Sequence, residues 1–150
     1  MTRTFVWATL VAGTLDILYA ALLSLIYGRS PAAMLRYVAS GPFPPATDMG
    51  MAGSILGLIV HFTLMSIMVA AFLIAARSWP TLLAKPIHAG ILYGLATYVV
   101  MNWIVVPLRF DVPLPPKPVS VISQLFAHIV LVGIPIAMIA AKMHRPRAIA

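Results

Sequence analysis

The sequence contains no cysteine and very few acidic residues. Without cysteine, its 150 residues cannot form disulfides, thiolate metal sites, iron–sulfur clusters or covalently attached haem. Only 9% of the residues are charged, and three of them are acidic, whereas an ordinary soluble domain is about 25% charged. The chain therefore has too few polar groups to cover the surface of a water-soluble domain.

Apolar residues dominate instead. They form 62% of the chain, and the mean hydropathy is +1.02, which also excludes a disordered chain and a coiled coil. The ten Lys and Arg residues give a net charge of +7, but they are scattered singly between apolar runs. Basic residues placed this way flank membrane spans, whereas a nucleic-acid interface needs a clustered basic face. We predict a polytopic membrane protein that contacts the lipid bilayer and no nucleic acid.

Four stretches are long enough to cross a bilayer, which takes about 20 mostly apolar residues per helix. They cover residues 5–27, 51–76, 86–106 and 119–141. They predict an all-α fold, a four-helix bundle that forms one integral membrane domain over residues 1–150. The first stretch is interpreted as a span and not as a cleaved signal peptide, because Asp16 interrupts what would be the apolar core of the signal.

The Lys and Arg residues at the span ends predict the orientation. One side of the membrane carries six of them: Arg3, Arg77, Lys85, Lys142, Arg145 and Arg147. The other side carries four: Arg29, Arg36, Arg109 and Lys117. By the positive-inside rule, both termini are expected in the cytoplasm.

The two outer connections and one proline carry further local signals. Ser30 as a cap, Pro31 in a first turn and Gly41 as a stop predict a short helix lying in the outer interface. Residues 107–118 contain five prolines, so this connection is expected to be extended and stiff. Pro135 is expected to kink the fourth span.

A set of short motifs is spread over nearly the whole chain. The motifs are Gly13-Thr14-Leu15-Asp16, Ser30-Pro31 to Ser40-Gly41, Gly57 with His61-Phe62, Gly90 to Gly94, Met101-Asn102-Trp103, Val106-Pro107-Leu108 and His128. Together they resemble small bacterial four-helix inner-membrane proteins, distantly those of the YagU-type group. The resemblance implies four helices in a bacterial inner membrane, and it implies no reaction.

Polar side chains inside the spans are the candidate functional residues, because ionisable groups are expensive in lipid. Several lie on stripes of small residues, which mark the faces where membrane helices approach closely. At about 1.5 Å per residue, His61 and His128 lie at similar depths, and Asp16 lies deeper. We predict one polar cluster in the outer half of the bundle, formed by Asp16, His61, Asn102, Gln124 and His128.

Four interpretations of this cluster remain open. It is a structural core whose hydrogen bonds define helix register, or a small-molecule or proton-conducting site open to the periplasm with Asp16 at its floor. Alternatively, His61 and His128 hold a b-type haem as axial ligands. In the fourth interpretation, Asp16, His61 and His128 bind a metal ion as a two-histidine, one-carboxylate set.

No motif of a hydrolase, a P-loop, a dinucleotide-binding fold or a zinc protease is present, so no catalytic residue is predicted. The favoured function is non-enzymatic: a small binding or transport-like bundle, or an accessory subunit of a larger membrane complex. The alternative is a membrane redox protein that binds haem or a metal. The Gly90–Gly94 motif suits either closure of the bundle or pairing of two protomers in a homo-oligomer.

Overall fold

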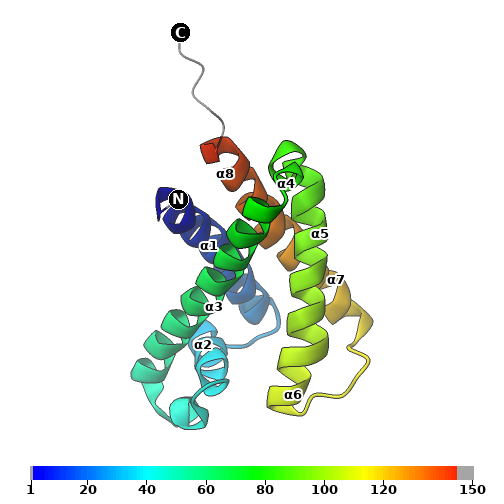
Figure 1. The fold of residues 1–150 in the computed structure, drawn as a ribbon. Coiled ribbons are helices and arrows are strands. Elements are labelled where there is room, and N and C mark those ends of the chain that lie inside the picture. The colour runs from blue at the N-terminus through cyan, green and yellow to red at the C-terminus, as the bar shows by residue number, and fades with distance from the viewer. Residues whose placement is uncertain (1, 145–150) are drawn as a thin grey trace.

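The computed structural model describes residues 2–144, and every regular element in that range is helical (Figure 1). Four helical stretches are long and apolar enough to cross a membrane: Thr2–Ile26, Gly50–Ser78, Pro86–Phe110 and Pro118–His144. This confirms the predicted all-α four-helix bundle and indicates a multi-pass membrane protein. Arg145 and Arg147, which were counted for the orientation, lie outside the described residues.

The first two spans are single helices, joined through a short helix that packs on the second. The elements in order are α1 (Thr2–Ile26), α2 (Pro31–Ser40), a 3₁₀ turn η1 (Pro44–Asp48) and α3 (Gly50–Ser78). Helix α2 has the predicted bounds, with Pro31 in its first turn. It lies along the first half of α3 (Figure 1), and a Cβ atom at Gly57 of α3 would overlap the main-chain carbonyl of Leu35. The sequence did not predict this contact, which makes α2 part of the packed bundle.

The third and fourth spans each contain a stretch of π-helix. After a short helical turn, α4 (Thr81–Ala84), the third span comprises α5 (Pro86–Val99), the π segment η2 (Val100–Val105) and α6 (Val106–Phe110). The fourth comprises α7 (Pro118–Phe126), the π segment η3 (Ala127–Gly133) and α8 (Ile134–His144).

Each π segment ends two residues before a proline, Pro107 or Pro135. A proline ring clashes with the carbonyl four residues earlier in an α-helix, and in these spans that carbonyl belongs to Trp103 or Leu131, inside the π segments. Because a π turn pairs each carbonyl with the amide five residues later, both helices continue through their prolines. The predicted span end at residue 106 and the predicted extended form of residues 107–110 are therefore wrong. Residues 111–117 are the non-helical part of this connection.

The two outer connections touch each other at the end of α6. The Arg109 side chain donates hydrogen bonds to the main-chain oxygens of Ser40, at 2.8 Å, and Gly41 at the end of α2. The rings of Tyr37 and Phe110 stack beside them, with their centroids 4.4 Å apart. These contacts join the helical hairpin of α2 and α3 to the end of the third span.

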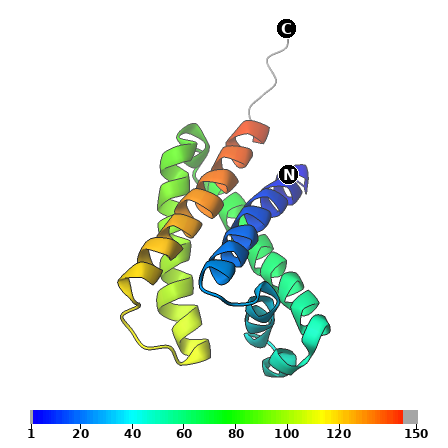
Figure 2. The same cartoon turned by 180° about the vertical axis from the view of Figure 1, so that it is seen from behind.

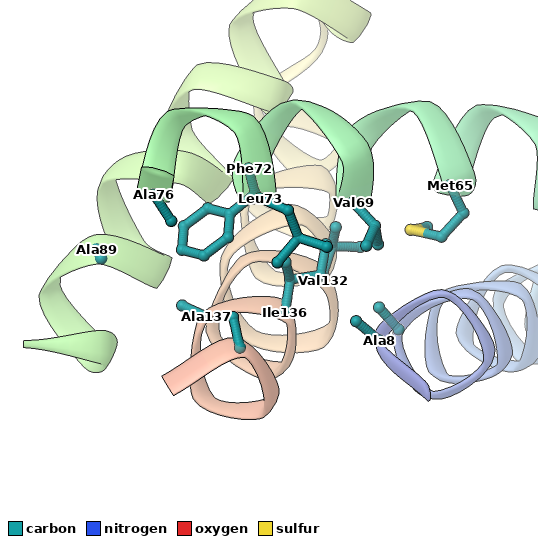
Figure 3. Packing of buried hydrophobic residues seen from close by; sticks show 12 residues of the cluster. Ala8, Met65, Val69, Phe72, Leu73, Ala76, Ala89, Val132, Ile136 and Ala137 are labelled. Atoms are coloured by element: carbon teal, nitrogen blue, oxygen red, sulfur yellow. The ribbon is translucent and has the colours of Figure 1, made fainter. Parts of the chain in front are cut away.

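The apolar core lies in the half of the bundle where α3 ends and α5 begins (Figure 3). Val69 and Phe72 of α3 and Ile136 of α8 are at most 1% exposed. Tyr93 of α5 donates a hydrogen bond of 2.5 Å to the main-chain oxygen of Met68, and its ring contacts that of Phe72 edge-on. Phe72, Tyr93 and their neighbours therefore hold α3 and α5 together in this half.

Helix α1 lies between α3 and the fourth span, and α5 packs on the other side of the fourth span. Towards α2 and α6, helices α3 and α5 diverge in both views (Figures 1 and 2). Gly90 and Gly94 contact the fourth span of the same chain: a Cβ atom on Gly90 would lie 2.6 Å from the Cα atom of Ile134, and one on Gly94 would overlap the carbonyl of His128. The glycine motif therefore closes the bundle within one chain.

Candidate functional site

Asp16 and His61 meet where α1 crosses α3. The ring atom Nε2 of His61 lies 2.9 Å from the main-chain oxygen of Gly13, and Nδ1 lies 3.9 Å from Oδ2 of Asp16. Gly13 and Asp16 are three residues apart and share one face of α1. The missing side chain at Gly13 allows this approach, because a Cβ atom there would lie 2.6 Å from the ring of Phe62.

The hydrogen bond to Gly13 determines which nitrogen of His61 carries a proton. A carbonyl oxygen only accepts hydrogen bonds, so Nε2 is the donor and is protonated. The second nitrogen, Nδ1, faces the carboxylate across a gap longer than a hydrogen bond. A single extra proton can therefore reside on Nδ1 or on Asp16, and the pair is neutral overall in either case.

The Asp16–His61 pair is enclosed but not sealed. The side chain of His61 is 10% exposed, and that of Asp16 is 25% exposed. Asp16 is the only carboxylate within the four spans, because the other two acidic residues, Asp48 and Asp111, lie at the ends of η1 and α6. A carboxylate inside an apolar span is costly unless it is paired or protonated. His61 supplies the partner, and a quarter of the Asp16 side chain stays uncovered by the described residues.

His128 forms a different arrangement between the third and fourth spans. Its Nδ1 lies 3.2 Å from the hydroxyl of Thr97, and its Nε2 lies 3.4 Å from the amide nitrogen of Asn102. The Thr97 hydroxyl donates its proton to the carbonyl of Gly94 at 3.0 Å, so its oxygen accepts from Nδ1 of His128. Nε2 is then an acceptor for Asn102, which also donates to the main-chain oxygen of Tyr98 at 3.3 Å. Both ring nitrogens are engaged when this histidine is neutral.

Four of the five predicted site residues contact one another as two pairs, and the fifth, Gln124, belongs to neither pair. Asp16 lies beside His61, and Asn102 lies beside His128. Gln124 is half-buried, and its side chain makes no hydrogen bond to any of residues 2–144. The sequence analysis missed Thr97, although it lies three residues after Gly94 and follows the same stripe of α5. It also missed the Gly13 carbonyl, since a main-chain acceptor leaves no signal in a sequence.

Neither predicted cofactor fits this arrangement. An axial haem ligand presents a ring nitrogen to the iron, but Nε2 of His61 is held by Gly13, and both nitrogens of His128 are engaged within the protein. Within residues 2–144, no three His, Asp or Glu side chains lie close enough together to hold a metal ion. The haem alternative would thus require His61 or His128 to give up these hydrogen bonds, and the metal alternative would require His128 to join Asp16 and His61.

No protein family, curated protein sequence or solved structure matches this chain. Its function is therefore inferred from the geometry of its own polar residues. Of the two pairs, only Asp16–His61 leaves a ring nitrogen without a hydrogen bond beside a carboxylate.

Proposed function

We propose that this chain is a non-enzymatic, transport-like protein of a bacterial inner membrane whose Asp16–His61 pair binds a proton within the bilayer. One observation carries the proposal: Nδ1 of His61 lies 3.9 Å from the carboxylate, while Nε2 is held on the Gly13 carbonyl. This arrangement leaves one position on the imidazole free to gain and lose a proton. The position faces the only carboxylate of the spans.

The pair suits a proton better than a larger solute. Transfer of one proton between Asp16 and His61 leaves the net charge of the pair at zero, so it avoids a lone charge in a medium of low dielectric. Gain of a second proton gives the pair a charge of +1, and loss of the only proton gives −1. The neutral form is therefore the resting state, and each charged form favours release or uptake of a proton.

The proposed location and orientation have separate support. Along the sequence, six Lys and Arg residues are assigned to the side of the chain termini and four to the other side, and two of the six, Arg145 and Arg147, lie outside the described residues. Under the positive-inside rule, this count favours cytoplasmic termini. The short motifs around Asp16, His61 and Asn102 resemble those of bacterial inner-membrane proteins of the YagU-type group. In this orientation, the Asp16–His61 pair is reached from the periplasmic side.

Proton flux into liposomes tests the proposal. The purified full chain is reconstituted with a pH-sensitive dye inside, and a potassium diffusion potential drives protons inward. Asp16→Asn is expected to lower the protein-dependent rate at least about tenfold, because the amide cannot take up a proton. Asp111→Asn makes the same chemical change outside the spans and serves as the matched control, with an expected rate within about twofold of the wild type.

Two results would contradict the proposal. One is a folded Asp16→Asn variant that carries protons as fast as the wild type, which would favour a structural role for the pair. The other is a wild-type chain that carries no protons and co-purifies with another membrane protein at a fixed ratio. That result would favour the accessory-subunit interpretation.

A further inference from the structure

A groove of about 430 Å³ lies between the start of α5 and the end of α8. Its lining consists of Pro86 from α5 and of Met138, Ile139, Ala141 and Lys142 from α8. The two helix ends lie side by side in both views (Figures 1 and 2). The groove is thus apolar along its walls and has one cation, at the end of a span where a membrane surface would lie.

Among the described residues, this end of the molecule carries basic side chains and no acidic one. The basic residues at this end of the described chain are Arg3, Arg77, Lys85 and Lys142. The sequence contains no Glu, and its three Asp residues lie either within α1 or at the opposite end of the bundle. The side chain of Lys142 is exposed and forms no hydrogen bond or ion pair with any of residues 2–144. Within the described chain, its ammonium group therefore has no partner that competes with a ligand.

We propose that this groove binds one anionic phospholipid. Lys142 contacts the phosphate, and the first part of an acyl chain lies along Met138 and Ile139. An ammonium group at the membrane surface attracts anionic headgroups, and Lys binds a phosphate as a point charge. The apolar walls disfavour a purely ionic ligand as the main occupant, because four of the five lining residues have apolar side chains. This inference does not depend on proton binding by Asp16.

A second groove provides an internal comparison. Its volume is about 390 Å³, and it lies along α3, where it is lined by Leu58, Ile59, Phe62, Thr63 and Ser66. None of these side chains is charged. A lipid chain that enters this groove has no cation to select its headgroup, so a preference for anionic lipid is expected only at Lys142.

Native mass spectrometry of the delipidated full chain in detergent tests the inference. The chain is titrated with phosphatidylglycerol or with phosphatidylcholine of the same acyl chains. The wild type is expected to bind one phosphatidylglycerol in preference to phosphatidylcholine. Lys142→Gln is expected to weaken phosphatidylglycerol binding about fivefold and to leave phosphatidylcholine binding unchanged. Lys117→Gln, at the opposite end of the bundle, is the matched control and should keep the preference.

A second variant tests the apolar part of the groove while it keeps the charge of Lys142. Met138→Trp fills the groove and keeps Lys142, so it is expected to weaken the binding of both lipids. Equal losses in Lys142→Gln and Lys117→Gln would overturn the inference, because they would indicate diffuse attraction to basic residues. Unchanged binding in Met138→Trp would overturn it as well. So would full displacement of phosphatidylglycerol by millimolar inorganic phosphate, since the acyl chain would then contribute nothing.

Discussion

His61 and His128 are buried to the same extent, yet their hydrogen-bond partners differ in number and in charge. They are 8% and 9% exposed, respectively. His128 has a hydrogen-bond partner for each ring nitrogen, and all of these partners are neutral side chains. His61 has one hydrogen-bond partner, the main-chain oxygen of Gly13, and its other nitrogen faces a carboxylate without a hydrogen bond. The number and charge of the partners therefore distinguish the two histidines, whereas burial does not.

The glycine contacts near the two histidines also differ, in whether they involve main-chain or side-chain atoms. Gly94, beside His128, packs against the main chain of the fourth span, where a Cβ atom would overlap a carbonyl and lie 2.6 Å from the Cα atom of Ile129. Gly13, beside Asp16, packs against the ring of Phe62, and a ring can rotate or shift. The close contact beside His128 is therefore between two main chains, which are rigid. The close contact beside Asp16 involves a side chain, which can move.

Exchange of the two histidines for glutamine is expected to produce the largest difference between the regions. The His61→Gln amide can still donate to the Gly13 carbonyl, but it cannot take up a proton beside Asp16. We expect it to lower proton flux into liposomes about tenfold. The His128→Gln variant replaces a ring whose nitrogens both have hydrogen-bond partners within the protein. Its proton flux should therefore stay close to that of the wild type. Equal losses in both variants would show that the two pairs act as one site.

A methyl group added at each glycine contact is expected to have the next largest effect. Gly94→Ala pushes two main chains apart, so we expect it to lower the free energy of unfolding by about 2–3 kcal/mol. Gly13→Ala displaces an aromatic side chain and should cost less than about 1 kcal/mol. Reversible unfolding in mixed micelles of sodium dodecyl sulfate measures both values. A larger loss for Gly13→Ala would reverse the distinction between the rigid region and the adaptable one.

The smallest expected effect concerns Thr97 alone. Thr97→Val keeps the shape of the side chain and removes the acceptor for Nδ1 of His128. Interhelical hydrogen bonds in membranes contribute about 0.6 kcal/mol on average, and an unpaired N–H in the bilayer adds to the loss. We therefore expect a loss of about 1 kcal/mol in the same unfolding measurement, with proton flux unchanged. A loss of flux would instead assign His128 a role in proton transfer.

The spans were predictable because hydropathy along the chain is a one-dimensional signal. Residue spacing also identified the inward faces, since Gly53, Gly57, Gly90 and Gly94 are all buried. Spacing could not show which faces meet. Helix α3 packs on α1 and diverges from α5 towards the end with α2 and α6, so His61 pairs with α1, and His128 pairs with α5 (Figures 1 and 2). The division into two pairs therefore depends on the order of the helices around the bundle. The spacing of residue types along each helix does not encode that order.

The prolines of the last two spans illustrate a second limit of prediction from the sequence. Pro107 was interpreted as a span end, and Pro135 as a kink, because both remove a main-chain donor and crowd an earlier carbonyl. The π segments before them accommodate both effects within continuous helices. Whether a helix responds to proline by ending, bending or widening depends on the neighbours that hold it, and those neighbours are set by the tertiary structure.

The π segment η3 also sets the rotational phase of everything that follows it. Because an α-helix turns about 100° per residue, deletion of one residue from Ala127–Gly133 would rotate α8 by roughly that angle relative to α7. Lys142 would then point away from the groove beside Pro86, while His128 could keep its place. The widened turn thus sets the angle, around the axis of one helix, between the polar contact of His128 and the membrane-surface groove beside Lys142.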